Sequence, residues 1–344
     1  MPTDRHETWT DGMTGLGAMV PRPRRSGESA ASGPGPERGA GTSRVVVADD
    51  GVELYVVVDG PEDAEVTMVF CHGLSMCLDC WQDQRTALAG RARLVMYDQR
   101  GHNRSGRGAA GSATIAQLGR DLHRILDEVV PVGPVVLVGH SMGGIAIMAL
   151  ARAHPEMFGP RIAGVALLST SAGGLSQITL GLPAYGARLL RPLLPGLLRL
   201  LGDDPARRGR AVEEIVHLLV RRYSFTSDVP ASVRDAAARV ICSAPAQVFR
   251  DFYPALMAHN GFAALGALRD IPTLVMVGGA DLVTPVAHSE AIAAALPSAR
   301  LVVLPETGHS LMLERPGSVN SALGRLLRRV TRPEPALREL SATR

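Results

Sequence analysis

The chain has 344 residues, of which 46% are apolar and 20% charged, and its formal net charge is +3. This length and apolar content suffice for a large core, in one domain with an insertion or in two domains. All 36 basic residues are arginine and are spread along the chain, which excludes a Schiff-base lysine and a P-loop lysine and provides no concentrated nucleic-acid-binding patch.

Residues 1–42 come first and are rich in Pro, Gly, Ser and Arg. They contain no apolar run with which to bury surface, so we expect a disordered tail. The stretch from Pro21 to Arg25 resembles a twin-arginine signal, but no hydrophobic segment follows it. Four cysteines in a chain of this length do not make a disulfide framework. The sequence therefore predicts a cytoplasmic protein with free thiols.

Beyond this tail, apolar runs of strand length alternate with runs of helical periodicity. A hairpin is expected from Arg44 to Asp59. Parallel strands are predicted to begin near residues 66, 93, 135, 162, 273 and 301. Helices are predicted at about 80–90, 113–130, 142–154, 285–296 and 317–330. This alternation predicts an α/β protein with a mostly parallel, doubly wound sheet of about eight strands.

The same pattern divides the chain into segments. Residues 43–171 and 266–330 form the predicted α/β core, and residues 331–344 form a polar C-terminal tail. The gap at 172–265 is too long for one crossover, so we predict a helical cap inserted after the sixth strand. Within it, residues 187–201 are leucine-dense, which favours short helices that bury leucines on the core. An apolar lid that admits lipophilic substrates, or contacts a membrane surface, is the alternative.

The predicted strand from Val66 to Cys71 is followed by the loop His72-Gly73-Leu74. Gly73 allows the backbone to turn, so that the Leu74 N–H can face the carboxyl edge of the sheet and serve as a donor of an oxyanion hole. Cys77 and Cys80 then follow with the C-x-x-C spacing of zinc and redox sites. Because no second such pair exists, we predict no metal site here.

The most informative segment reads VVLVGHSMGG from residue 135 onward. An apolar strand leads into Gly139, then Ser141 and Gly143, and a helical stretch follows at once. This order of strand, tight turn and helix is the context of a G-x-S-x-G nucleophile elbow, where side chains on the two glycines would collide with backbone. We therefore predict Ser141 as a nucleophile and the Met142 N–H as an oxyanion donor at a helix N-terminus.

A serine nucleophile needs a base and a group that orients the base. Asp281 follows the strand at 272–277, and His309 follows the strand at 301–304. In a parallel sheet both loops emerge at the same edge as Ser141, so the three side chains can converge. The order serine, acid, histidine is also the one typical of enzymes with this elbow.

Other candidates for these two roles are weaker. The strand after the elbow ends in Ser169 to Ala172, which offers no carboxylate. Glu306 is typical of a solvated loop acid. His288, near Pro285 in the next predicted helix, is the rival for the base, whereas His140 is expected to pack inside the elbow. Asp281 and His309 therefore remain the predicted acid and base.

The GHSMGG elbow, the His-Gly loop at 72–73 and the turn from Tyr97 to Gly106 together resemble the α/β-hydrolase superfamily, in the branch with a short HG-x oxyanion loop. The resemblance covers about residues 43–330 except the variable middle. The turn usually reads D-x-R-G-x-G-x-S; here Asn103 replaces its second glycine, after His102. We interpret Asp98 and Arg100 as structural residues that hold this loop. The resemblance implies an α/β-hydrolase fold whose cap forms the roof of the substrate pocket.

These features predict a serine carboxylesterase or lipase-like hydrolase that acts on a small, lipophilic ester and needs no cofactor. Ser141 attacks the ester carbonyl, His309 takes the serine proton, and Asp281 orients the imidazole. A thioesterase, a lactonase, a C–C bond hydrolase and a cofactor-free perhydrolase remain alternatives on the same residues. A non-catalytic ligand-binding protein of the same fold is the alternative from a different class.

Overall fold

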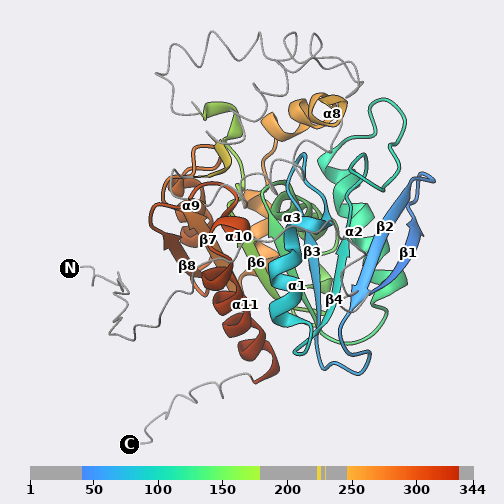
Figure 1. The fold of residues 1–344 in the computed structure, drawn as a ribbon. Coiled ribbons are helices and arrows are strands. Elements are labelled where there is room, and N and C mark those ends of the chain that lie inside the picture. Colours follow the sequence, from blue (N-terminus) through green and yellow to red (C-terminus); the bar gives the residue numbers. More distant parts are fainter. Residues whose placement is uncertain (1–40, 179–222, 226–228, 230–245, 333–344) are drawn as a thin grey trace, which may run out of the picture. The chain divides into compact units, whose positions relative to one another are not determined.

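The computed structural model describes residues 41–178, 223–225, 229 and 246–332, which all belong to one compact unit, Ala40–Arg344 (Figure 1). The two predicted tails lie outside the described residues, except at their inner ends, and so does the leucine-dense stretch at 187–201. Among the described residues, no helix has the length and apolar character that crossing a membrane requires.

The centre of the described structure is one sheet. In chain order its strands are β1 (Thr42–Val47), β2 (Glu53–Asp59), β3 (Thr67–Cys71), β4 (Arg93–Tyr97), β5 (Val135–His140), β6 (Ile162–Leu168), β7 (Thr273–Gly278) and β8 (Arg300–Leu304). Their order in space is β1-β2-β4-β3-β5-β6-β7-β8. The pairings β1–β2 and β2–β4 are antiparallel, and the remaining pairings are parallel. The predicted mostly parallel sheet of eight strands is confirmed.

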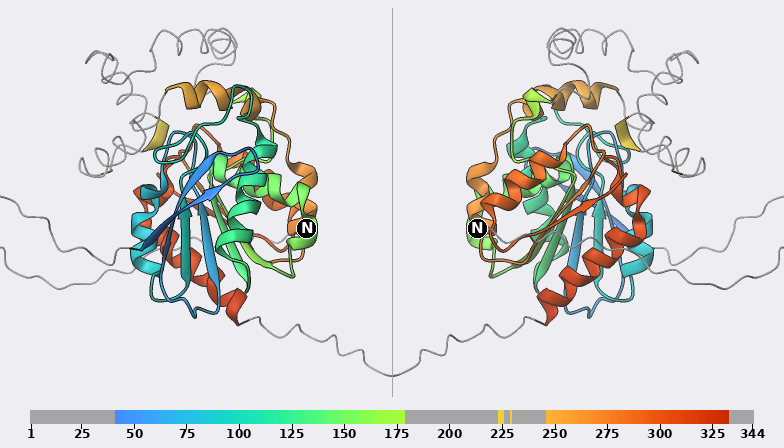
Figure 2. Two further views of the ribbon diagram at one scale, coloured as in Figure 1. Left: turned by 90° about the vertical axis from the view of Figure 1, so that its right-hand side faces the viewer. Right: turned by 90° about the vertical axis from the view of Figure 1, so that its left-hand side faces the viewer.

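Helices cover both faces of this sheet (Figure 2). On one face lie α1 (Gln82–Leu88) and α11 (Pro316–Thr331), and on the other lie α2 (Ile115–Val129), α3 (Met142–Ala153) and α9 (Val286–Ala295). The chain first moves from β3 to β4 and then reverses past β3 to reach β5. Because crossovers between parallel strands are right-handed, this reversal places α1 and α2 on opposite faces.

The two layers of helices bury the central strands completely. Every residue of β3 and β5 is buried, which explains why these strands are continuous apolar runs rather than alternating ones. The predicted helices are present, with small shifts at their ends; the first begins as a 3₁₀ turn at Leu78–Trp81. The one-turn helix α10 (Leu311–Glu314) was not predicted, because four residues are too few to show a helical period.

Helix α8 (Ala246–Met257) lies in the segment predicted as a cap. It contacts the loop that follows β4: Arg107 forms an ion pair with Asp251 at 2.9 Å, and the Val248 side chain lies next to Gly101. Figure 1 shows this helix beyond the carboxyl ends of the strands. Helix α8 therefore covers the loop after β4.

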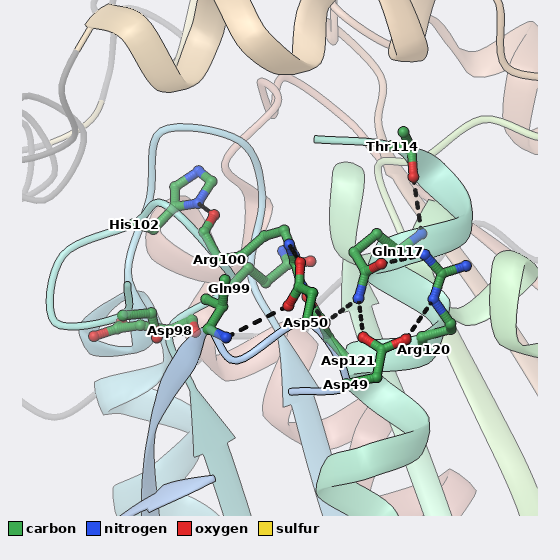
Figure 3. Close-up of polar contacts among 12 residues, drawn as sticks. Asp49, Asp50, Asp98, Gln99, Arg100, His102, Thr114, Gln117, Arg120 and Asp121 are labelled. Atoms are coloured by element: carbon green, nitrogen blue, oxygen red, sulfur yellow. Dashed lines mark hydrogen bonds and ion pairs between the residues drawn. The ribbon is translucent and has the colours of Figure 1, made fainter. Parts of the chain in front are cut away.

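The loop after β4 is built around a buried arginine (Figure 3). The Arg100 guanidinium, 2% exposed, donates two hydrogen bonds of 2.6 Å to Asp121 of α2 and two more, of 2.8 and 3.1 Å, to Asp50. Asp98 accepts the Leu78 N–H at 2.8 Å and the side-chain amide of Asn103 at 3.0 Å. These contacts agree with the interpretation of Asp98 and Arg100 as structural residues.

We expect Asp121→Ala to lower the free energy of unfolding by about 3–5 kcal/mol, because among the described residues it leaves the buried Arg100 with the partly exposed Asp50 as its one charged partner. Urea unfolding followed by circular dichroism measures this loss. Glu128→Ala is the matched control, since it removes an exposed ion pair with Arg124 on the same helix and should cost less than about 0.5 kcal/mol. Equal losses for the two variants would contradict the structural role of Arg100.

Candidate active site

The site lies where the order of the strands reverses, between the neighbouring parallel strands β3 and β5. Such a switch point opens a crevice between the loops that follow the two strands. Cys71 of β3 pairs with Gly139 of β5, so the loop at 72–76 lies next to Ser141. A methyl group on Gly73 would stand 3.3 Å from the Ser141 Cβ atom and 2.6 Å from Nδ1 of His140. The fold thus brings the His-Gly loop and the elbow together, and only glycine fits at position 73.

Ser141 stands at the turn between β5 and α3 with φ 50° and ψ −116°. A non-glycine residue in such a conformation stores about 1–3 kcal/mol of strain, which the surrounding structure must hold. The Ser141 N–H donates to the carbonyl oxygen of Leu168 at 3.0 Å, and the Ser141 carbonyl accepts from the Thr170 hydroxyl at 2.7 Å. These bonds fix the backbone of the turn, while the serine remains partly exposed.

Close backbone contacts explain the two glycines of the elbow. A Cβ atom on Gly143 would lie 2.0 Å from the carbonyl oxygen of Cys71, and one on Gly139 would lie 2.6 Å from the carbonyl oxygen of Gly143. Both distances are far shorter than van der Waals contact. The first turn of α3 therefore packs directly on β3 and β5, with Ser141 at its N-terminal end.

Asp281 and His309 meet on neighbouring loops, after β7 and β8. His309 Nδ1 donates a hydrogen bond of 2.9 Å to Asp281 Oδ2, and both side chains are buried. Burial raises the pKa of Asp281, but the charge and hydrogen bond of His309, together with hydrogen bonds from Thr284, outweigh it and lower the pKa below its usual value. The carboxylate is therefore ionised and accepts the Nδ1 proton of His309, so the tautomer that this bond selects has its lone pair on Nε2.

His140 connects the elbow to the loop of His309. Its Nε2 donates to the His309 carbonyl oxygen at 3.0 Å, and the centroids of the two rings are 4.8 Å apart. Burial, with a smaller effect of the neighbouring His309, lowers the pKa of His140 to about 3. The His140 ring is therefore neutral. Because His140 directly precedes Ser141, its hydrogen bond links the elbow to the backbone of His309, the candidate base.

The two amides predicted as oxyanion donors flank the same serine. Met142 follows Ser141 as the first residue of α3, and Leu74 follows Gly73 in the adjacent loop. Within the described part of the chain, neither N–H group has a hydrogen-bond acceptor. Both amides are therefore candidate donors beside the elbow.

The rival candidates lie in other environments. His288 Nδ1 is 2.8 Å from the Ser171 hydroxyl, and Glu306 is exposed. Cys77 and Cys80 are buried free thiols, and burial raises the pKa of Cys77 to about 11. No group of three or more His, Cys, Asp or Glu side chains among the described residues is arranged to hold a metal ion.

Two contacts that shape the site were not predicted. Thr284 donates its hydroxyl to Asp281 Oδ2 at 2.8 Å and its N–H to Oδ1 at 2.8 Å. The spacing Asp281-x-x-Thr284 is a detectable signal for this contact, since aspartate often accepts from an amide three residues later. The bond from His140 to His309 has no such signal, because 169 residues separate its partners.

Comparisons with known proteins agree with this architecture. The family model described as alpha/beta hydrolase fold matches residues 66–316. The relative named "Putative carbamate hydrolase RutD" from Variovorax paradoxus (strain S110) is 29% identical over 283 residues, which are 81% of this chain and 98% of that protein.

Two solved structures are similar over most of their length. A thermophilic esterase from Thermogutta terrifontis has a TM-score of 0.67 and 26% identity, covering 84% of this chain and 99% of its own. The enol-lactonase from Burkholderia xenovorans LB400 has a TM-score of 0.66 and 25% identity, and the match covers 83% of this chain and 99% of the lactonase chain. The family match runs from just before β3 to the start of α11 and so includes both the reversal of the sheet and the elbow. On these grounds the chain belongs to the alpha/beta hydrolase fold family.

Proposed function

We propose that the protein is a serine hydrolase that cleaves a carboxylic ester of a hydrophobic substrate through an acyl-enzyme. The observation that carries this proposal is the buried 2.9 Å hydrogen bond between His309 and Asp281, in a loop joined by His140 to the elbow of Ser141. An oriented imidazole with a lone pair on Nε2 is what a serine hydroxyl needs in order to become a nucleophile. The esterase and lactonase structures and the relative named for carbamate hydrolysis support chemistry at an acyl carbon.

In the proposed first step, the Ser141 oxygen attacks the ester carbonyl carbon while His309 Nε2 takes the hydroxyl proton. The bond to the leaving alcohol breaks, and His309 gives the proton to its oxygen. A water molecule then gives a proton to His309 and attacks the acyl carbon. The bond from this carbon to the Ser141 oxygen breaks, His309 returns the proton to that oxygen, and the acid leaves. Asp281 stays ionised throughout and stabilises the imidazolium.

The negative charge that develops on the carbonyl oxygen needs donors that are already in place. We assign this role to the Leu74 and Met142 amides. One such donor is worth about 10²–10³ in kcat in a site that excludes water. Met142 gains further from its position at the N-terminus of α3, where the helix dipole favours negative charge.

The proposed substrate is lipophilic because the insertion between β6 and α8 contains the leucine-dense stretch at 187–201. Esters, lactones and carbamates share an acyl carbon with a heteroatom leaving group, so the same residues can serve each of them. The acyl chain length is the property that the cap would select. A series of p-nitrophenyl esters from acetate to palmitate tests this: turnover confined to the shortest esters would remove the lipophilic substrate.

Covalent labelling tests the nucleophile itself. We expect a fluorophosphonate probe to label the wild-type protein at Ser141, as read by mass spectrometry of the labelled peptide, and to leave Ser141→Ala unmodified. Ser171→Ala is the matched control, because this buried serine lies after β6 and bonds to His288 instead; it should be labelled like the wild type. Labelling at another serine, or none in the folded wild-type protein, would overturn the proposed function.

A further inference from the structure

The loop that contains Leu74 is fastened to the loop after β4 through two buried histidines. Nε2 of His72 accepts the N–H of Gln99 at 2.9 Å, and the Gln99 side-chain amide donates to the His72 carbonyl at 2.5 Å. On the other side of Leu74, the N–H of Ser75 donates to Nε2 of His102 at 3.0 Å. The two imidazole rings meet edge to face, with centroids 5.0 Å apart. The loop is thus held on both sides of the proposed oxyanion donor.

The hydrogen bonds of His102 define its tautomer. Nδ1 lies 3.0 Å from the carbonyl oxygen of Arg100, so Nδ1 bears the proton. Nε2 therefore offers the lone pair that accepts the Ser75 N–H. Burial, together with a smaller effect of the neighbouring His72, lowers the pKa of His102 to about 3. The ring is neutral near neutral pH and can hold the Ser75 amide only in this form.

His102 is itself held by neighbouring groups. The side chain of Arg100, whose carbonyl orients the ring, is locked by Asp121 and Asp50. Figure 3 shows the imidazole extending from its loop toward α8, and the Phe252 ring of that helix has its centroid 6.2 Å away. His102 is fully buried, so water does not compete for Nε2.

Ser75 needs such an anchor. Its φ of 61° is unusual for a residue other than glycine, and strain of this kind persists only where surrounding contacts hold it. The Ser75 N–H and the Leu74 carbonyl belong to one peptide group. The bond to His102 fixes this group and thereby orients the backbone at Leu74. We propose that His102 is a positioning residue for the oxyanion hole: it holds the Ser75 amide so that the Leu74 N–H stays directed at the reacting carbonyl. This inference rests on the proposed function.

Two substitutions separate the bonds of His102. In His102→Gln the side-chain oxygen reaches the position of Nε2 and can accept the Ser75 N–H. In His102→Asn the side-chain amide can replace Nδ1 as the donor to Arg100, but it is too short to reach Ser75. His123→Asn is the control for replacing a histidine by an asparagine, because His123 is half-buried on α2 and stacks on His154.

We expect His102→Asn to lower kcat for the best p-nitrophenyl ester by about 10- to 100-fold with KM nearly unchanged, because an oxyanion donor acts mainly in the transition state. His102→Gln should recover most of the loss, and His123→Asn should match the wild type. A purely structural role in the loop after β4 predicts the reverse order, with Asn active and Gln impaired. That order, or equal kcat for all variants, would overturn the proposal.

Amide hydrogen exchange gives a readout that does not depend on turnover. The Ser75 amide should exchange at least about tenfold faster in His102→Asn than in the wild type and stay protected in His102→Gln. Unchanged exchange in His102→Asn would also overturn the proposal, even if kcat fell. If the wild type hydrolyses no ester and Ser141 is not labelled, the proposed function fails and the role of His102 fails with it. If the wild type is active while His102→Asn keeps full kcat, only the inference about His102 fails.

Discussion

Ser141→Ala should lower kcat for ester hydrolysis by at least about 10⁴-fold, because the variant has no hydroxyl to form the acyl-enzyme and retains only what the oxyanion amides contribute to direct attack by water. Steady-state kinetics with a p-nitrophenyl ester measure the loss, and thermal unfolding confirms that the variant is folded. Residual activity above about one hundredth of the wild-type value would contradict a nucleophilic role for Ser141.

The same position offers a control that links activity to strain. Glycine adopts the backbone angles of Ser141 without a steric penalty, whereas alanine does not. We expect Ser141→Gly to be as inactive as Ser141→Ala but more stable than it by about 1 kcal/mol in urea unfolding. Equal stability of the two variants would show that the turn holds little strain.

Asp281→Asn should have the second-largest effect, a loss of about 10⁴-fold in kcat, because an amide can favour the wrong tautomer of His309 and cannot stabilise the imidazolium. The variant keeps nearly the same shape, so the effect isolates the charge. Glu306→Gln is the matched control: this exposed acid lies three residues before His309 and should leave kcat unchanged. A large loss in Glu306→Gln with an active Asp281→Asn would reverse the assignment of the acid.

Asp281 should also contribute to stability in a pH-dependent way. Its pKa in the folded protein is lower than the usual value, so the ionised carboxylate stabilises the folded state above the unfolded-state pKa of about 3.9. This contribution is lost as the pH falls from there through the folded pKa. In Asp281→Asn the free energy of unfolding should therefore fall less steeply with pH in this acidic range than in the wild type, as urea titrations at several pH values will measure.

Local patterns in the sequence predicted much of the fold and of the site. The run VVLVGHSMGG indicates both the strand and the elbow, because an apolar run, a glycine-flanked serine and a helical period are all contained in ten neighbouring residues. Asp281 and His309 were predicted because each follows an apolar run of strand length, and parallel strands end at one edge of the sheet. Asn103 replaces a glycine at φ 45°, a conformation that asparagine tolerates better than most residues.

What the sequence determined by itself is therefore the set of elements and the residues at their ends, since periodicity and turn chemistry act over a few neighbours. Only the tertiary structure decided how these ends meet. Two hydrogen bonds join segments that are far apart in the chain: His140 to the His309 carbonyl, across 169 residues, and Ser75 to His102, across 27 residues. The lack of space for a side chain at Gly73 likewise comes from His140 and Ser141 on a neighbouring segment. Such contacts depend on strand order and on the direction of each side chain, and no local pattern contains that information.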